Sequence, residues 1–127
     1  MTETVIIAVN DPNILYLLQR YVEESGFLPV AALHGPTILN LLTRQPSPAL
    51  LILDMGYPEV SGPETLSELQ AAAATHSVPI VLYSCVDEPP DTWREVAAAY
   101  LPKSVMYTDF VDALKRAGVE MVPAGRA

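Results

Sequence analysis

Short apolar runs alternate along this chain with segments of helical periodicity, and proline separates many of these segments. Residues 4–9 form a continuous run rich in β-branched side chains, which is typical of a strand buried on both faces. Nearly all of the 12 prolines fall between the periodic segments and not inside them. Further apolar runs that we interpret as strands cover residues 27–33, 49–53, 78–83 and 100–101. The pattern therefore predicts five strands, each apolar along its whole length.

A segment of helical periodicity follows each of these runs. Asp11 and Pro12 form a helix start, with an N-cap followed by proline at the first helical position, and Ser25-Gly26 ends that helix. The other predicted helices cover residues 36–44, 63–74, 92–99 with Asp91 as the N-cap, and 109–117 with Thr108 as the N-cap and Gly118 after the last turn. Strands that alternate with helices in this way predict an α/β fold of five βα units. Its parallel sheet would be doubly wound, with right-handed crossovers that cover both faces.

The length and composition fit one ordinary globular domain. Of the 127 residues, 50% are apolar, which is enough for one core that needs no metal or disulfide to support it. The lone Cys85 excludes an intramolecular disulfide, since that bond needs two cysteines. We expect the domain to span residues 1–120, followed by a short C-terminal tail over residues 121–127.

Charge and hydropathy narrow the class of partner. The net charge of −8 disfavours binding to a phosphate backbone, and no stretch gathers Lys or Arg into a basic stripe. The longest apolar runs are far shorter than the ~20 residues that cross a bilayer, and the N-terminus has no basic, signal-like start. We therefore expect a cytoplasmic protein that binds neither nucleic acid nor membranes directly.

Polar side chains follow four of the five predicted strands, at the point where each strand ends. They are Asn10 and Asp11 after the first strand, Asp54 after the third, Ser84 after the fourth and Lys103 after the fifth. In an open parallel sheet, ligands bind outside the carboxyl ends of the strands. Neighbouring carboxylates repel each other unless a cation lies between them, and an all-oxygen site suits Mg²⁺. Lysine and a hydroxyl are donors suited to a phosphoryl group, so the set predicts a carboxylate nucleophile, a metal and a phosphoryl pocket.

Three stretches at these strand ends resemble the receiver domain of two-component response regulators, the CheY-like family. Residues 54–62 are similar to the family's phosphoacceptor loop, with a proline four and a glycine eight residues after the aspartate. Residues 79–84 resemble the fourth strand, which ends in the switch Thr or Ser, and residues 100–103 resemble the fifth strand, with an aromatic residue three positions before the lysine. The resemblance runs over nearly the whole chain and implies the flavodoxin-like strand order 2-1-3-4-5.

The resemblance implies a phosphorylation site. Asp54 would accept a phosphoryl group from a phosphohistidine of a sensor histidine kinase or of a histidine phosphotransfer protein. Asp11, Asp54 and the backbone carbonyl of Gly56 would hold Mg²⁺, and Asn10 would contribute weakly through a bound water. A receiver catalyses at most its own phosphorylation and dephosphorylation, so we do not expect an enzyme that acts on a separate substrate.

The resemblance also implies a conformational switch. Lys103 and Ser84 would bind phosphoryl oxygens, and Tyr100 would move inward when Ser84 shifts. The switched form would act through a downstream protein target, or through a homodimer made by the face that combines the last two helices with the last strand.

The chain departs from the family pattern in the site and around the lysine. Asn10 stands where the family usually has the first of two adjacent acids. Ser104 replaces the proline that normally follows the lysine, while Pro102 precedes it. The stretch from Ser84 to Lys103 is also short for the family. The alternative function is therefore a degenerate receiver that works as a phosphorylation-independent protein-interaction module.

Several of these residues also have ordinary structural interpretations. Asp11 before a proline is a common N-cap, and the roles of cap and metal ligand are compatible. Trp93, Val96, Tyr100 and Val105 fit either a partner-binding patch or core packing.

Two other functions that α/β folds often have are not supported, because their motifs are missing from the chain. The chain has no G-x-G-x-x-G, and an acidic turn follows the first strand where an FMN module needs a phosphate loop.

Overall fold

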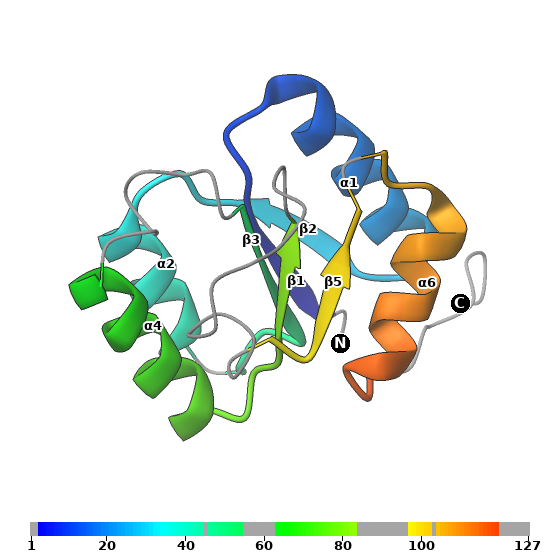
Figure 1. Cartoon of the computed structure of the whole chain (residues 1–127). Helices are drawn as coiled ribbons and strands as arrows, with labels where there is room; N and C mark the ends of the chain where they lie inside the picture. The colour runs from blue at the N-terminus through cyan, green and yellow to red at the C-terminus, as the bar shows by residue number, and fades with distance from the viewer. Residues whose placement is uncertain (1–2, 45, 55–62, 84–96, 103, 120–127) are drawn as a thin grey trace.

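The computed structural model describes residues 3–44, 46–54, 63–83, 97–102 and 104–119 of the chain, so the predicted tail over residues 121–127 lies outside them. Within these residues, parallel strands form one sheet between two layers of helices (Figure 1). In chain order the elements are β1 (Thr4–Ala8), α1 (Pro12–Glu24), β2 (Leu28–Ala31), α2 (Gly35–Leu42), β3 (Leu50–Asp54), α4 (Pro63–Thr75), β4 (Ile80–Tyr83), β5 (Ala99–Leu101) and α6 (Tyr107–Arg116). The predicted α/β architecture is confirmed.

The sheet has the strand order β2-β1-β3-β4-β5, and all of its neighbouring strands are parallel, as predicted. β1, β3 and β4 form its centre, where Val5 pairs with Leu50 and Leu51 pairs with Ile80. Every residue of β3 and β4 is buried. β2 and β5 form the two edges and keep exposed side chains, because each has a neighbouring strand on one side only.

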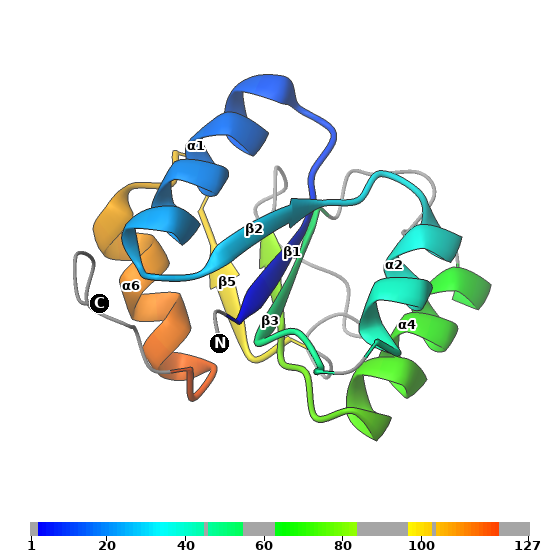
Figure 2. The ribbon, with the colours of Figure 1, turned by 180° about the vertical axis from the view of Figure 1, so that it is seen from behind.

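Helices cover both faces of the sheet: α1 and α6 lie on one face, and α2 and α4 lie on the other (Figures 1 and 2). Successive residues of a strand point to opposite faces, so each central strand contributes to two cores. In β1, Val5 and Ile7 pack in the core under α1 and α6, whereas Ile6 and Ala8 pack in the core under α2 and α4. This two-sided burial accounts for the continuous apolar runs in the sequence.

The first helix begins and ends as predicted. Asp11 is the N-cap of α1, and its side chain accepts backbone N–H groups of the first turn. Pro12 occupies the first helical position, where no N–H is needed. The helix ends at Glu24, and Gly26, with a φ of 89°, takes the left-handed conformation that turns the chain toward β2.

The last helix starts earlier than predicted. α6 begins at Tyr107 with Met106 as its N-cap residue, so the predicted start at Asp109 with Thr108 as the cap is wrong. The carboxylate of Asp109 accepts the backbone N–H of Met106 at 2.9 Å. The contact from Asp109, in the first turn, thus sets the position where the helix starts. The prediction failed because it relied on the preference for threonine at the N-cap position.

The predicted helix over residues 92–99 is wrong at its C-terminal end. Ala99 is the first residue of β5, and the two alanines before it are not helical. The backbone N–H of Ala98 donates to the carbonyl of Ile80 at 2.8 Å, so this segment already pairs with β4. The helix propensity of alanine is a weak preference that such sheet hydrogen bonds override. Residues 91–96 lie outside the described residues, and the other predicted elements agree with the structure to within one or two positions.

Candidate functional site

Strand register brings several predicted site residues to one edge of the sheet. Asp54, the last residue of β3, lies beside Tyr83, the last residue of β4. On the other side of β3, the parallel strand β1 ends at Ala8, and Asn10 and Asp11 follow as the chain leaves it. The carboxyl ends of these strands therefore meet at one edge, which we call the carboxyl edge.

Asp54 combines a carboxylate with burial. The residue is 6% exposed, and it is the only buried Asp, Glu, Lys or Arg among the described residues. It follows four buried apolar residues of β3. Taking a carboxylate out of water is unfavourable unless neighbouring groups or a cation compensate. Within the described part of the chain, this buried acidic residue at a strand end is the strongest single indication of a functional site.

Asp11 is exposed and is fixed by the start of α1. Its Oδ1 accepts the backbone N–H of Asn13 at 2.8 Å and that of Ile14 at 3.4 Å. The N-cap interpretation of Asp11 is therefore confirmed. Its contacts with other described residues use Oδ1 only, so Oδ2 is a second oxygen donor near the carboxyl edge. Asn10, also exposed, adds an amide beside it.

The described donors at the carboxyl edge are hard oxygen ligands. They comprise the carboxylates of Asp11 and Asp54, with the amide of Asn10 beside Asp11. The described residues contain no group of three or more His, Cys, Asp or Glu side chains that could hold a metal by themselves. Mg²⁺ does not need such a group, since one or two carboxylates commonly hold it and it keeps several waters. The donor set therefore fits Mg²⁺ and does not fit a structural zinc site.

The predicted partner patch divides between surface and core. Tyr100 on β5 is 40% exposed, although its two neighbours in the strand are buried. Val105 is 4% exposed and belongs to the core under α1 and α6. Trp93 and Val96 lie outside the described residues. Of the two interpretations of these residues, core packing is confirmed for Val105, and Tyr100 faces solvent.

Three predicted site residues, Gly56, Ser84 and Lys103, lie outside the described residues. Ser84 follows Tyr83 directly in the sequence, and Lys103 follows Leu101 by two positions. Tyr83 and Leu101 end neighbouring strands and lie side by side. The described strand ends next to these two residues thus belong to the carboxyl edge.

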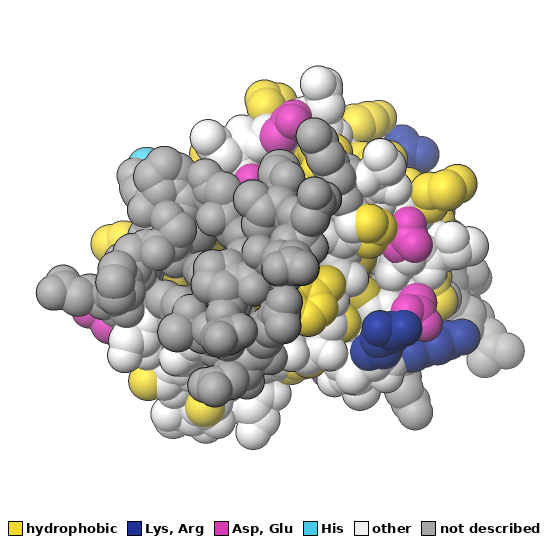
Figure 3. Space-filling model, viewed as in Figure 1, with side chains coloured by type: hydrophobic (Ala, Val, Ile, Leu, Met, Phe, Trp, Pro, Cys, Tyr) yellow, Lys and Arg dark blue, Asp and Glu magenta, His cyan; other side chains and the backbone are white. Residues whose placement is uncertain are grey.

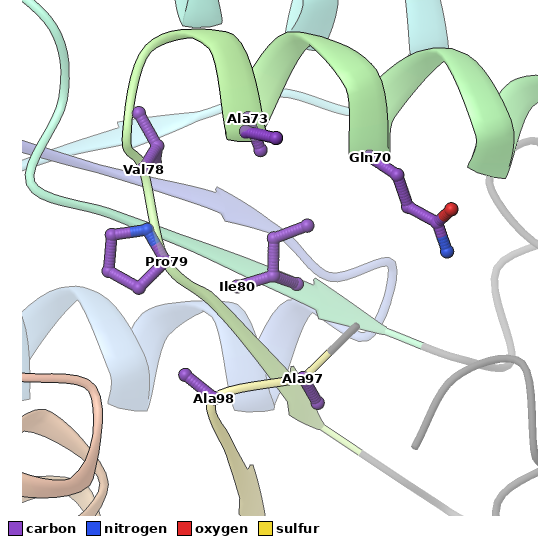
Figure 4. A pocket seen from close by; sticks show the side chains of 8 residues that line it. Gln70, Ala73, Val78, Pro79, Ile80, Ala97 and Ala98 are labelled. Carbon is purple, nitrogen blue, oxygen red and sulfur yellow. The ribbon is translucent and has the colours of Figure 1, made fainter. Parts of the chain in front are cut away.

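A pocket of about 450 Å³ lies elsewhere, between α4 and the starts of β4 and β5 (Figure 4). Val78, Pro79 and Ile80 line one side, alanines of α4 and of the segment before β5 line the rest, and Gln70 supplies a polar side chain. Because β4 begins at Ile80, this pocket lies toward the amino ends of the strands. It is therefore separate from the carboxyl edge.

Basic side chains on the face shown in Figure 3 gather mainly over the last turn of α6, where Lys115 and Arg116 stand. Arg116 Nε lies 2.9 Å from Asp112 Oδ2, and both side chains are more than half exposed, at 69% and 61%. Exposed pairs of this kind contribute little to stability.

No helix within the described ranges is long and apolar enough to span a membrane.

Comparison with known proteins decides the family. The model of the response regulator receiver domain matches residues 5–115, which is most of the chain. The chain belongs to this family. The resemblance predicted from the three strand-end stretches is thereby confirmed, and the chain is a receiver domain of the two-component signalling type.

Relatives of this receiver domain include whole proteins of similar length. The polar-differentiation response regulator DivK of Brucella ovis is 25% identical over 118 residues, which cover 91% of this chain and 95% of DivK. The phosphate regulon transcriptional regulatory protein PhoB of Escherichia coli is also 25% identical over 118 residues, which cover 91% of this chain and 51% of PhoB. This receiver thus aligns with nearly the whole of one relative and with about half of the other.

Solved structures show the same fold. The response regulator receiver protein from Burkholderia phymatum matches with a TM-score of 0.72 at 21% identity, over 94% of this chain and 98% of that chain. The bacteriophytochrome response regulator AtBRR matches with a TM-score of 0.77 at 23% identity, over 99% of each chain. Both matches show that this receiver has the fold of these solved structures.

Two contacts, one beside Asp54 and one between α1 and the β5–α6 connection, were not predicted from the sequence. Tyr83 was interpreted only as the end of an apolar run, yet it is buried beside Asp54. The hydroxyl of Tyr21 contacts Val105, a residue 84 positions away. Alignment of the strand ends could have indicated the first contact. No local pattern signals the second, because it depends on how α1 and the β5–α6 connection pack together.

Proposed function

We propose that this receiver accepts a phosphoryl group on Asp54. The donor is a phosphohistidine of a sensor histidine kinase or of a histidine phosphotransfer protein in the cytoplasm, and Mg²⁺ is required. The observation that carries the proposal is the buried carboxylate of Asp54 at the end of the central strand β3, in a chain of the receiver family. A buried carboxyl group at the end of a central strand is the place where this family resemblance puts the phosphoacceptor.

In the proposed reaction, a carboxylate oxygen of Asp54 attacks the phosphorus in line with the phosphorus–nitrogen bond of the donor. The new bond is an acyl phosphate, and the bond to the histidine nitrogen breaks. Mg²⁺, when bound, offsets the negative charges of the carboxylates and of the phosphoryl oxygens. Asp11 offers its Oδ2 to that ion while its Oδ1 caps α1. Lys103 and Ser84 bind phosphoryl oxygens in this proposal, which for these two residues rests on the family resemblance.

Phosphorylation then alters partner binding through Ser84 and Tyr100. Attraction of the Ser84 hydroxyl to the phosphoryl group leaves space that Tyr100 fills, so two packings exchange population. The exposed position of Tyr100 supports this step, since a side chain that is 40% exposed can still become buried. Met106, the N-cap residue of α6, is 65% exposed and is a second exposed apolar side chain in the segment from β5 to α6. A downstream protein, or a second copy of the chain, would bind this face.

Intact mass spectrometry after incubation with acetyl phosphate and Mg²⁺ tests the proposal. We expect wild-type protein to gain the mass of one phosphoryl group, and hydroxylamine to remove it as it cleaves an acyl phosphate. Asp54→Asn should gain no mass. Asp112→Asn is the matched control, because it makes the same chemical change at a 61% exposed side chain of α6 and should leave the mass gain intact. Phosphorylation of Asp54→Asn at the wild-type level would contradict the assignment.

The second candidate function is a receiver that works without phosphorylation as a protein-interaction module. Asn10 favours it, because an amide in place of an acid brings no negative charge to the metal site. The buried carboxylate of Asp54 and the retained Asp11 favour phosphorylation. Wild-type protein that gains no phosphoryl mass at saturating Mg²⁺ would decide for the interaction module.

A further inference from the structure

The helix α1 is joined by a side chain to the connection between β5 and α6. Tyr21 of α1 donates its hydroxyl to the backbone carbonyl of Val105 at 3.3 Å. Val105 is 4% exposed and lies in the connection that follows Leu101 and precedes Tyr107. The contact therefore reaches from the helix that Asp11 caps to the segment after β5.

Aromatic packing holds Tyr21 in place. Its ring centroid lies 5.4 Å from that of Tyr107 and 5.9 Å from that of Phe110, both in α6. The Tyr107 hydroxyl lies 3.4 Å from Oγ of Ser25, which is fully buried and also donates to the carbonyl of Tyr21 at 3.0 Å. At 3.3 Å the hydroxyl contact to Val105 is longer than a strong O–H···O bond. Ring packing and the hydroxyl together fix the position of the carbonyl.

The connection is also held at both of its ends. Leu101 pairs with Tyr83 in the sheet, and the N–H of Met106 donates to the carboxylate of Asp109. Between these ends, the contact to Val105 is the hydrogen bond that ties the connection to α1 within the described residues. Lys103 stands in this connection in the sequence, two positions before Val105.

We infer that Tyr21 is a positioning residue for phosphoryl transfer, because its hydroxyl holds the β5–α6 connection that carries Lys103. The inference rests on the proposed function and goes beyond it by giving α1 a role in placing the phosphoryl-binding lysine. Tyr21 does not touch the phosphoryl group and acts only through the carbonyl of Val105. Transfer rates are sensitive to small displacements of a charged group that stabilises the transition state.

Tyr21→Phe tests this role because it removes the hydroxyl and keeps the ring. We expect the rate of phosphorylation by acetyl phosphate at saturating Mg²⁺ to fall about threefold, equivalent to about 0.65 kcal/mol, in the lower part of the range for one hydrogen bond. The Mg²⁺ concentration for half-maximal rate should not change. Amide hydrogen exchange in a peptide covering residues 99–106 should become faster, which reports the loosened connection without any phosphorylation.

Two matched tyrosine variants separate positioning from general loosening. Tyr16→Phe makes the same change on the same helix at a residue that is 62% exposed. Tyr107→Phe removes the contact with Ser25 inside the aromatic cluster and leaves the Val105 contact intact. Both should be phosphorylated at the wild-type rate.

A double variant tests whether the hydroxyl acts through the lysine. In a Lys103→Ala background, Tyr21→Phe should cause no further slowing of phosphorylation.

The outcomes distinguish this inference from the proposed function. Phosphorylation of Tyr21→Phe at the wild-type rate overturns the inference alone. Equal slowing by Tyr107→Phe, or a full additional effect in the Lys103→Ala background, also overturns it, since the effect would then come from packing. Wild-type protein that gains no phosphoryl mass overturns the proposed function and the inference together.

Discussion

Asp11 has one observed role and one proposed role in this receiver, and two substitutions separate them. It caps α1 through Oδ1, and it is proposed to bind Mg²⁺ through Oδ2. Asp11→Ala removes both roles. Asp11→Asn keeps a side-chain oxygen that can cap the helix, because asparagine and aspartate are comparable N-caps, but it removes the charge that attracts the ion.

The expected magnitudes follow from these contacts. Loss of the two N-cap hydrogen bonds in Asp11→Ala should lower the free energy of unfolding by about 1 kcal/mol, or the Tm by about 4 °C for a domain of this size. Asp11→Asn should lose at most about 0.5 kcal/mol, from the weaker interaction with the helix dipole. Mg²⁺ at ten times its Kd should stabilise wild-type protein by about 1.4 kcal/mol. Both variants should lose most of that increment.

Urea unfolding with and without Mg²⁺ measures all of these quantities without relying on phosphorylation. Asp112→Asn serves as the control, because it changes an exposed acid on α6 and should keep both the stability and the Mg²⁺ increment. If Asp11→Asn is as unstable as Asp11→Ala in the absence of Mg²⁺, the cap argument is refuted. If Asp11→Asn keeps the full Mg²⁺ increment, Asp11 is not a ligand of the ion.

Three further predictions concern the metal site, the core and the switch. Asn10→Asp should tighten Mg²⁺ binding about tenfold, or about 1.4 kcal/mol, because it adds a negative charge near the ion. Calorimetric titration measures the two affinities, and equal values would show that residue 10 is too far from the ion to affect its binding. Phe110→Ala removes a ring that is 1% exposed and packs on Tyr21. The free energy of unfolding, measured in urea, should fall by about 3–5 kcal/mol, and a loss below about 1 kcal/mol would contradict this packing. Beryllofluoride with Mg²⁺ should change the amide chemical shifts of β5 and α6, and Ser84→Ala should suppress that response while phosphorylation continues. Unchanged shifts in wild-type protein saturated with beryllofluoride would rule out the switch.

The candidate site could be predicted in outline because its position follows from strand direction. Asp54, Asn10 and Asp11 each follow an apolar run, and parallel strands bring their carboxyl ends to one edge. The cap role of Asp11 is local as well, since it joins residues two and three positions apart. The burial of Tyr83 beside Asp54 could not be predicted in the same way, because it depends on the register between β3 and β4, and the sequence does not specify that register.

The sequence by itself determined the strands, the strand order implied by its family resemblance and the start of α1, because apolar periodicity and capping act over a few residues. Tertiary structure decided that Ala99 joins β5, since the hydrogen bonds that β4 offers outweigh the helix propensity of alanine. It also decided that Tyr21 meets Val105, 84 positions along the chain. That contact requires α1 and α6 to pack on the same face of the sheet, and no short stretch of sequence encodes this packing.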